Sequence, residues 1–184
     1  METHEAVGNY QSDPSGAKAH GDLAVSAARI NPCPFKAEGP SAGGIKTAVE
    51  DFMREYARHS DEGDVAALAM CFAETFVAGG SQGAKAVRAS DFAQALPKRY
   101  KLFAQMGCRR TELVSMETQQ MDARYVWART WWRLTFERAG GDALPVEVES
   151  SYLVDAGAEP MRFLVYLAHD DIMGMLRERG IATA

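Results

Sequence analysis

The hydrophobic period of the chain changes from helical to extended near residue 124, and this change constrains the fold more than any single residue. In the earlier part, apolar side chains recur at helical spacing at Ile45, Val49, Phe52, Met53 and Tyr56. From Arg124 onward the period is two, and one side of the predicted strand carries Val126, Ala128, Thr130, Trp132, Leu134 and Phe136. Helices that precede a run of hairpin-linked strands indicate an α+β domain, in which the helices cover one face of an antiparallel sheet.

Charge and composition argue against several classes of partner. The chain has 184 residues and a net charge of −5, which fits one domain with an appendage. Lysine and arginine are scattered rather than gathered in a stripe, so we expect no nucleic-acid partner. The longest apolar run, residues 163–168, is far too short for a membrane helix, and no secretory signal is visible. Three widely spaced cysteines, Cys33, Cys71 and Cys108, favour a reducing cytoplasm over a disulfide framework.

The chain divides near residue 43. Residues 1–43 are rich in proline, glycine, serine and alanine and show neither period, so we expect a flexible leader. The alternative is an arm that packs on a partner subunit, with Pro34 and Phe35 as its anchor. Residues 44–184 form the predicted folded domain.

Turn and capping signals divide this domain into elements. The predicted helices span residues 45–59, 64–72, 91–96, 97–107 and 171–179, and the predicted strands span 76–78, 84–88, 109–117, 124–137, 146–155 and 161–169. Thr47 with Glu50 fits a capping pair for the first helix, and Asp64 is the expected N-cap of the second. Because a proline inside a helix costs about 3 kcal/mol, the third helical stretch is expected to break at Pro97.

Several segments resemble proteins of the NTF2-like superfamily. Residues 56–64 (YARHSDEGD) and 71–74 (CFAE) resemble the opening motif of that superfamily. Later segments, at 95–99, 125–132, 151–154 and 166–171, resemble uncharacterised bacterial SnoaL-like proteins, and the resemblance covers residues 44–180. It implies a cone, in which a strongly curved sheet wraps round helices and leaves a pocket open at one end. The superfamily contains polyketide cyclases, ketosteroid isomerases and scytalone dehydratases as well as binding proteins, so the fold does not give the function.

The resemblance also supplies catalytic positions that can be compared one by one. In ketosteroid isomerases, a tyrosine of the first helix donates to the substrate oxygen, and Tyr56 stands at the matching place. The place of their general base is held by Gly80, which cannot accept a proton, and the place of their second donor by Ser150. Proton abstraction by that mechanism is therefore not expected.

His169 is the second candidate for catalysis, because an imidazole at a strand end can act as an acid or a base near neutral pH. Asp170 beside it could fix the tautomer, although neighbouring residues on a strand point to opposite faces. The alternative is a structural role at the strand end, with Asp170 or Asp171 capping the closing helix. His59 is expected at the surface. The four histidines are far apart, so we predict no metal site, and no cofactor is expected.

The inner face of the sheet is predicted to line the pocket. Alternation places Thr130 and Trp132 on the inner side of one strand, and Ser150 and Tyr152 on the inner side of the next. With Tyr56 they make up the predicted ligand-binding set, in which Tyr56 orients the ligand. The alternatives are a core tyrosine at Tyr56, hydroxyls of Thr130 and Ser150 satisfied by the sheet, and core packing for Trp132.

The outer face of the long strand alternates aromatic and basic groups, namely Tyr125, Trp127, Arg129, Trp131 and Arg133. Monomeric domains seldom expose such a stripe, and these residue types are enriched in interfaces. We therefore expect a homodimer through this face. The alternative is an intramolecular stack of the arginines on the tryptophans.

Two functions of different classes are consistent with these patterns. The first is a non-catalytic domain that binds a small apolar molecule in the cone. The alternative is a cofactor-independent cyclase, isomerase or dehydratase that acts on a cyclic or polyketide-like substrate through Tyr56 and His169. A third interpretation is a dimerisation module whose cone is filled by side chains.

Overall fold

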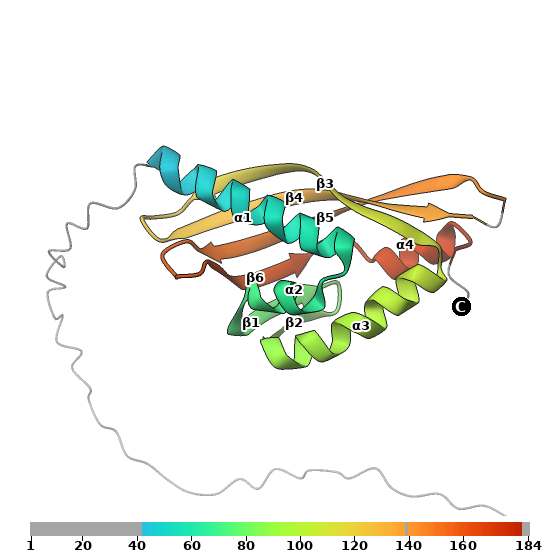
Figure 1. Ribbon diagram of the computed structural model, residues 1–184, viewed down its shortest axis with the longest axis horizontal. Helices are drawn as coiled ribbons and strands as arrows, with labels where there is room; N and C mark the ends of the chain where they lie inside the picture. The colour runs from blue at the N-terminus through green and yellow to red at the C-terminus, as the bar shows by residue number, and fades with distance from the viewer. Residues whose placement is uncertain (1–41, 139, 182–184) are drawn as a thin grey trace, which may run out of the picture. The chain divides into compact units, whose positions relative to one another are not determined.

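A computed structural model describes residues 42–138 and 140–181 (Figure 1). The helices of this part are α1 Ala42–Glu62, α2 Val65–Met70, α3 Ala89–Gln105 and α4 Ile172–Glu178. Its strands are β1 Phe72–Gly80, β2 Gly83–Arg88, β3 Cys108–Gln120, β4 Tyr125–Glu137, β5 Ala143–Asp155 and β6 Arg162–Ala168. The predicted leader lies outside the described residues except for its last two, so its flexibility stays a prediction.

The described strands form one sheet in the order β2-β1-β6-β5-β4-β3, and the α+β class is confirmed. Most neighbours are antiparallel, and Gly80 pairs with Gly83 across the tight turn that joins β1 and β2. The sheet is mixed rather than wholly antiparallel, because β1 and β6 run parallel. Hairpin spacing in a sequence predicts pairing only between consecutive strands. Because β1 and β6 are far apart in the sequence, their parallel pairing could not be predicted in this way.

The hydrophobic core lies on one face of this sheet, under the helices that Figure 1 shows in front of it. The buried residues of β4 and β5 include Val126, Ala128, Thr130, Trp132, Leu134, Phe136, Val146, Ser150, Tyr152 and Val154. Helix α1 contributes Ile45, Val49 and Met53, which recur every four residues. The predicted inner face is therefore confirmed on both strands.

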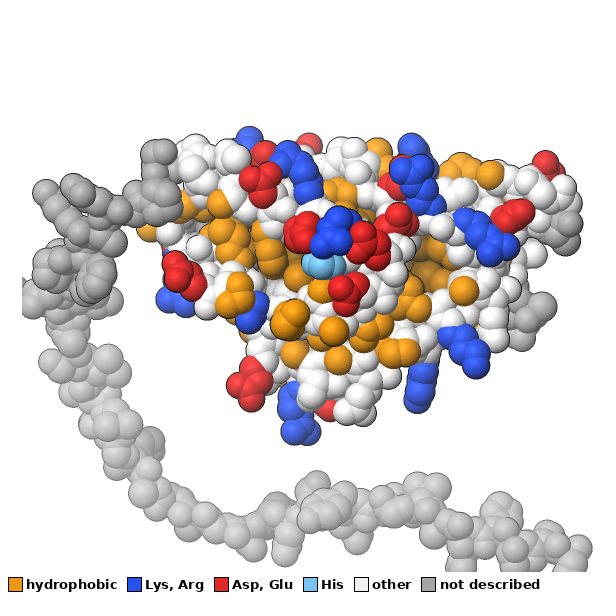
Figure 2. Space-filling model, viewed as in Figure 1, with side chains coloured by type: hydrophobic (Ala, Val, Ile, Leu, Met, Phe, Trp, Pro, Cys, Tyr) orange, Lys and Arg blue, Asp and Glu red, His pale blue; other side chains and the backbone are white. Residues whose placement is uncertain are grey.

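The outward face of α1 is charged. Glutamate, aspartate, lysine and arginine side chains pair at spacings of three and four residues along it, as between Glu50 and Arg54 and between Arg58 and Glu62. Figure 2 shows these charged side chains gathered over α1, with hydrophobic side chains exposed on either side of the helix.

Two predictions about the helices are wrong. Thr47 lies inside α1 rather than at its start, and its Oγ1 donates to the carbonyl oxygen of Gly43, 3.0 Å away in the preceding turn. Helix α3 runs unbroken through Pro97. Proline removes one backbone hydrogen bond, but Leu96 and Phe103 are buried on the same helix, and this packing outweighs the local preference for a break.

The predicted caps of the two short helices are present. Asp64 Oδ1 accepts a hydrogen bond from the Ala67 backbone nitrogen at 3.0 Å, at the start of α2. Asp171 Oδ1 accepts one from the Gly174 nitrogen, also at 3.0 Å, at the start of α4. None of the helices in the described part is both long enough and apolar enough to cross a membrane.

Candidate functional site

A cavity of about 100 Å³, open to solvent on one side, lies between the inner face of the sheet and helices α1 and α3. Its apolar wall consists of Leu68, Phe92, Leu96, Phe103, Trp132, Leu134 and Val148. Its more polar side chains are Tyr56, Ser60, Arg99, Tyr100, Thr111, Ser150, Tyr152 and Tyr166. The structure therefore brings together four of the five residues predicted to bind a ligand: Tyr56, Trp132, Ser150 and Tyr152.

Tyr56 stands among aromatic rings from four strands, including Phe72 of β1 at 6.1 Å between ring centroids. Its ring centroid is 4.9 Å from that of Phe163, 5.8 Å from that of Tyr152 and 6.0 Å from that of Trp132, each time edge to face. Burial raises the pKa of Tyr56 far above its usual range and Tyr166 adds to this, whereas Arg99 and a hydrogen bond with Tyr152 oppose it. The hydroxyl is consequently a neutral donor at physiological pH.

Thr130, the fifth predicted residue, does not line the cavity but holds a residue that does. Its Oγ1 accepts a hydrogen bond from Trp132 Nε1 at 2.8 Å and donates to the Ser150 carbonyl oxygen at 3.0 Å, and Thr130 itself has no exposed surface. This geometry supports the structural alternative for Thr130. Because the indole N–H of Trp132 is already bonded, Trp132 offers only its ring to the cavity.

Five polar residues of the cavity were not predicted from the sequence, namely Ser60, Arg99, Tyr100, Thr111 and Tyr166. Arg99 lies on α3, and its guanidinium carbon is 5.2 Å from the ring centroid of Phe103. Tyr166 of β6 pairs with Tyr152 of β5, and their ring centroids are 5.3 Å apart. The sequence does indicate the position of Arg99, because Leu96, Arg99 and Phe103 are three and four residues apart and so lie on one side of a helix. The predicted break at Pro97 assigned Leu96 and Arg99 to two different helices, so this spacing was not recognised.

Arg99 remains a cation in this setting. Burial lowers the pKa of Arg99, but the nearby Tyr166 and Tyr56 raise it more, so the net direction is upward. The residue as a whole is exposed, so the burial concerns the part of its side chain that lines the cavity, where the charge affects the pKa of Tyr56 and Tyr152. Arg99 therefore lines the cavity while part of the residue stays exposed to solvent.

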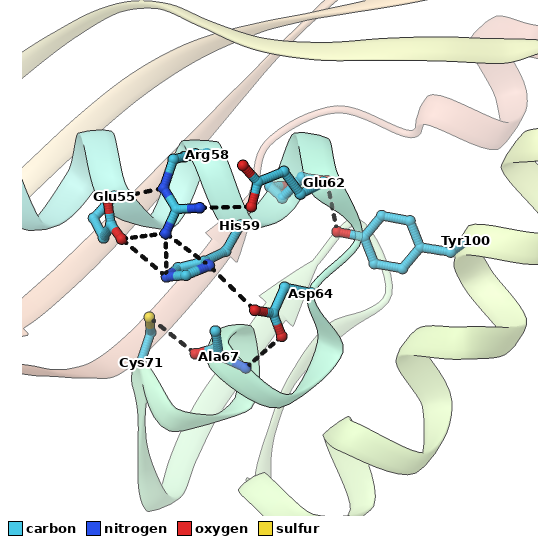
Figure 3. A network of polar contacts seen from close by, with 9 residues as sticks. Glu55, Arg58, His59, Glu62, Asp64, Ala67, Cys71 and Tyr100 are labelled. Carbon is cyan, nitrogen blue, oxygen red and sulfur yellow. Dashed lines mark hydrogen bonds and ion pairs between the residues drawn. The ribbon is translucent and has the colours of Figure 1, made fainter.

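A polar network at the end of α1 joins three helices beside the cavity (Figure 3). Tyr100 of α3 donates to the Ser60 carbonyl oxygen at 2.9 Å. The side chain of His59 is only 15% exposed, and its ring nitrogens lie 3.3 Å from Glu55 Oε1 and 3.6 Å from Asp64 Oδ2. His59 therefore lies partly exposed rather than fully at the surface, and these carboxylates, on α1 and at the start of α2, flank its ring.

No group of histidine, cysteine and carboxylate side chains suited to a metal ion occurs within residues 42–138 and 140–181. Cys71 and Cys108 are both free thiols, and burial raises the pKa of Cys71 to about 11 and also raises the pKa of Cys108. Neither thiol is therefore activated as a nucleophile or as a metal ligand at neutral pH.

No protein-family model and no curated protein matches the sequence. Among solved structures, the chain is similar to Aln2 from a Streptomyces species, with 16% identity, a TM-score of 0.58, and coverage of 78% of this chain and 99% of that one. It is also similar to an NTF2-like protein with a cystatin-like fold from Novosphingobium aromaticivorans, with 12% identity, a TM-score of 0.59, and coverage of 77% and 90%. The chain has the NTF2-like fold. A third match, a protein from Catenulispora acidiphila in complex with S-DNPA, has 12% identity, a TM-score of 0.56, and coverage of 77% and 99%.

In this NTF2-like domain, His169 lies outside the cavity. Its Nε2 is 2.8 Å from Ser151 Oγ and 3.7 Å from Glu149 Oε1. Ser151 and Glu149 alternate with Ser150 along β5, so they project from the face opposite to the cavity. Both contacts use the same ring nitrogen, whereas a Ser–His–carboxylate relay needs one partner on each nitrogen. The structure does not bring His169 together with Tyr56. The position of His169 therefore gives no support to acid–base chemistry in the cavity.

The outer face of the NTF2-like sheet carries the predicted aromatic and basic stripe, and its arginines have partners on the neighbouring strand. Arg129 donates two hydrogen bonds to Glu149, of 2.5 and 2.9 Å, and Arg133 donates two to Glu147 Oε1, of 3.2 and 2.8 Å. The Arg129 guanidinium carbon also lies 5.3 Å from the ring centroid of Trp131. The intramolecular alternative is therefore present for Arg129.

Proposed function

We propose that this NTF2-like domain binds a small cyclic molecule, mainly apolar, in the cavity between α1, α3 and the inner face of the sheet. The observation that carries the proposal is the cavity itself, which has an apolar and aromatic wall and a few polar groups that converge on it. An apolar cavity of about 150 Å³ binds benzene in another protein. The cavity here is smaller, at about 100 Å³, but open to solvent, so it can take one ring that partly extends outward and not a large polycyclic molecule.

The alternative is a cofactor-independent cyclase, isomerase or dehydratase, and the composition of the cavity argues against it. Within the described part of the chain, no aspartate, glutamate or histidine lines the cavity. General base catalysis needs a group with a pKa near the working pH, whereas burial raises the pKa of Tyr56 and Tyr152 and an arginine stays protonated. Gly80 lies in the β1–β2 hairpin and not at the cavity, so that position supplies no base either. The side chains of the cavity are suited to binding and orienting a ligand rather than to removing a proton.

Filling the cavity tests the proposal. Toluene is a suitable neutral probe, and its binding to the full chain can be followed by chemical-shift changes in NMR spectra. Val148→Trp places an indole in the cavity and should abolish these shifts. Val114→Trp makes the same change at an exposed position, where 46% of the valine is accessible, and should leave them intact. If toluene leaves the spectrum of the wild-type protein unchanged at saturating concentration, the proposal is wrong.

We further propose that the domain forms a homodimer through the outer face of β4, with Trp127, Arg129, Trp131 and Arg133 in the contact. The two tryptophans are only half-buried within the subunit. Because Glu149 and Glu147 already neutralise the arginines, the face is closer to neutral than its sequence suggests, which lowers the desolvation cost of a contact. The cytoplasmic location expected from the cysteines stays a proposal.

A further inference from the structure

Arg99 places an unneutralised positive charge in the cavity. Within residues 42–138 and 140–181, it is the only charged side chain that lines the cavity. Arg124 and Arg129, by contrast, each bind a carboxylate, at Asp155 and Glu149. A guanidinium beside aromatic walls, without a carboxylate on the same walls, leaves several N–H donors free for a ligand.

Three tyrosines from three different elements lie close to this charge. Tyr56 comes from α1, Tyr152 from β5 and Tyr166 from β6, and each affects the pKa of Arg99. The ring of Tyr152 lies near both others, with centroid separations of 5.8 Å from Tyr56 and 5.3 Å from Tyr166. Since burial raises the pKa of Tyr56 and of Tyr152, these hydroxyls stay protonated and can donate. Hydrogen bonds of this kind are stronger to an anionic oxygen than to a neutral one.

We propose that Arg99, Tyr56, Tyr152 and Tyr166 form an anion subsite, and that the molecule bound in the cavity is a ring compound with a carboxylate group. A carboxylate accepts two parallel hydrogen bonds from a guanidinium and has lone pairs left for a phenol hydroxyl. The ring of the ligand lies on the apolar wall, while its carboxylate faces Arg99. The inference rests on the proposed function, because it adds a charged group to the ligand of the same cavity.

Benzoate and benzamide are matched probes, since they differ in charge but hardly in size. We expect the wild-type protein to bind benzoate more tightly than benzamide at pH 7, by a factor on the order of ten, as a charge-assisted bond predicts. Arg99→Gln should remove this preference, with a larger loss of affinity for benzoate than for benzamide, because it keeps the ring contacts and removes the charge. Lys98→Gln removes the same charge from the neighbouring position of α3, which does not line the cavity, and should keep the preference.

Titration calorimetry on the full chain gives both dissociation constants, and the melting temperature of each variant reports on folding. Tyr152→Phe is a second variant, which should reduce the preference by removing one donor while keeping the ring. Equal binding of the two probes by the wild type, or an undiminished preference in Arg99→Gln, would overturn the anion subsite but leave the proposed function standing. A lack of binding by toluene, benzamide and benzoate alike would overturn both.

Discussion

Replacing Thr130 with valine tests whether a buried hydroxyl holds the wall of the cavity in place. Thr130 Oγ1 bonds Trp132 Nε1 at 2.8 Å and the Ser150 carbonyl oxygen at 3.0 Å, and none of the three residues is more than 5% exposed. Valine has nearly the same shape but no hydroxyl, so the indole N–H loses its partner. An unsatisfied buried donor costs about 1–3 kcal/mol, and the lost bond to Ser150 about 1 kcal/mol more. We therefore expect the free energy of unfolding to fall by about 2–4 kcal/mol.

Thr130→Ser is the matched control, because it keeps the hydroxyl and removes only a methyl group, at about 1 kcal/mol. Urea unfolding followed by far-ultraviolet circular dichroism measures both variants without relying on Trp132 fluorescence. In a Trp132→Phe background the donor is already gone, so Thr130→Val should cost at least about 1 kcal/mol less there. The reasoning is refuted if the loss is the same in both backgrounds, or if it does not exceed that of Thr130→Ser.

Three further predictions concern a ligand contact, an ion pair and the assembly. Tyr56→Phe should weaken the binding of benzamide by about 0.5–1.5 kcal/mol in calorimetry, with little change in melting temperature; a lower melting temperature at unchanged affinity would make Tyr56 a core residue. Hydrogen bonds from Arg124 lower the pKa of Asp155, so the stability from this pair is present above the unfolded-state pKa of about 3.9 and is lost as the pH falls through the lower folded-state pKa. Arg124→Gln should accordingly be less stable than the wild type at pH 6 and equally stable near pH 2, and a pH-independent difference in urea unfolding would contradict this. Trp131→Glu should convert a dimer to a monomer in light scattering, and a wild-type protein that is monomeric at micromolar concentration would rule out the proposed interface.

The buried faces of the long strands and the start of α2 were predictable from the sequence because they depend on local geometry, whereas the bounds of α1, β1 and α3 and the end of α2 were not. Side chains alternate in any strand, so the period of two in residues 124–137 and 146–155 identified the buried sides of β4 and β5. Asp64 could be identified as a cap because the amide that it binds lies three residues further along the chain. Tyr56, Trp132, Ser150 and Tyr152 were found for the same reason, since each lies on a side that the period marks as inward.

Only the tertiary structure decided which inward residues meet. Arg99 reaches Tyr56, Tyr152 and Tyr166 because α3 continues through Pro97, and the local cost of that proline is outweighed by side chains buried elsewhere on the helix. Strand β6 lies between β5 and β1, which places Tyr166 in the cavity. A sequence period fixes the side of an element on which a residue lies. The order in which strands pair, and the packing that keeps a proline within a helix, depend on contacts between residues far apart in the chain, so they are properties of the whole core.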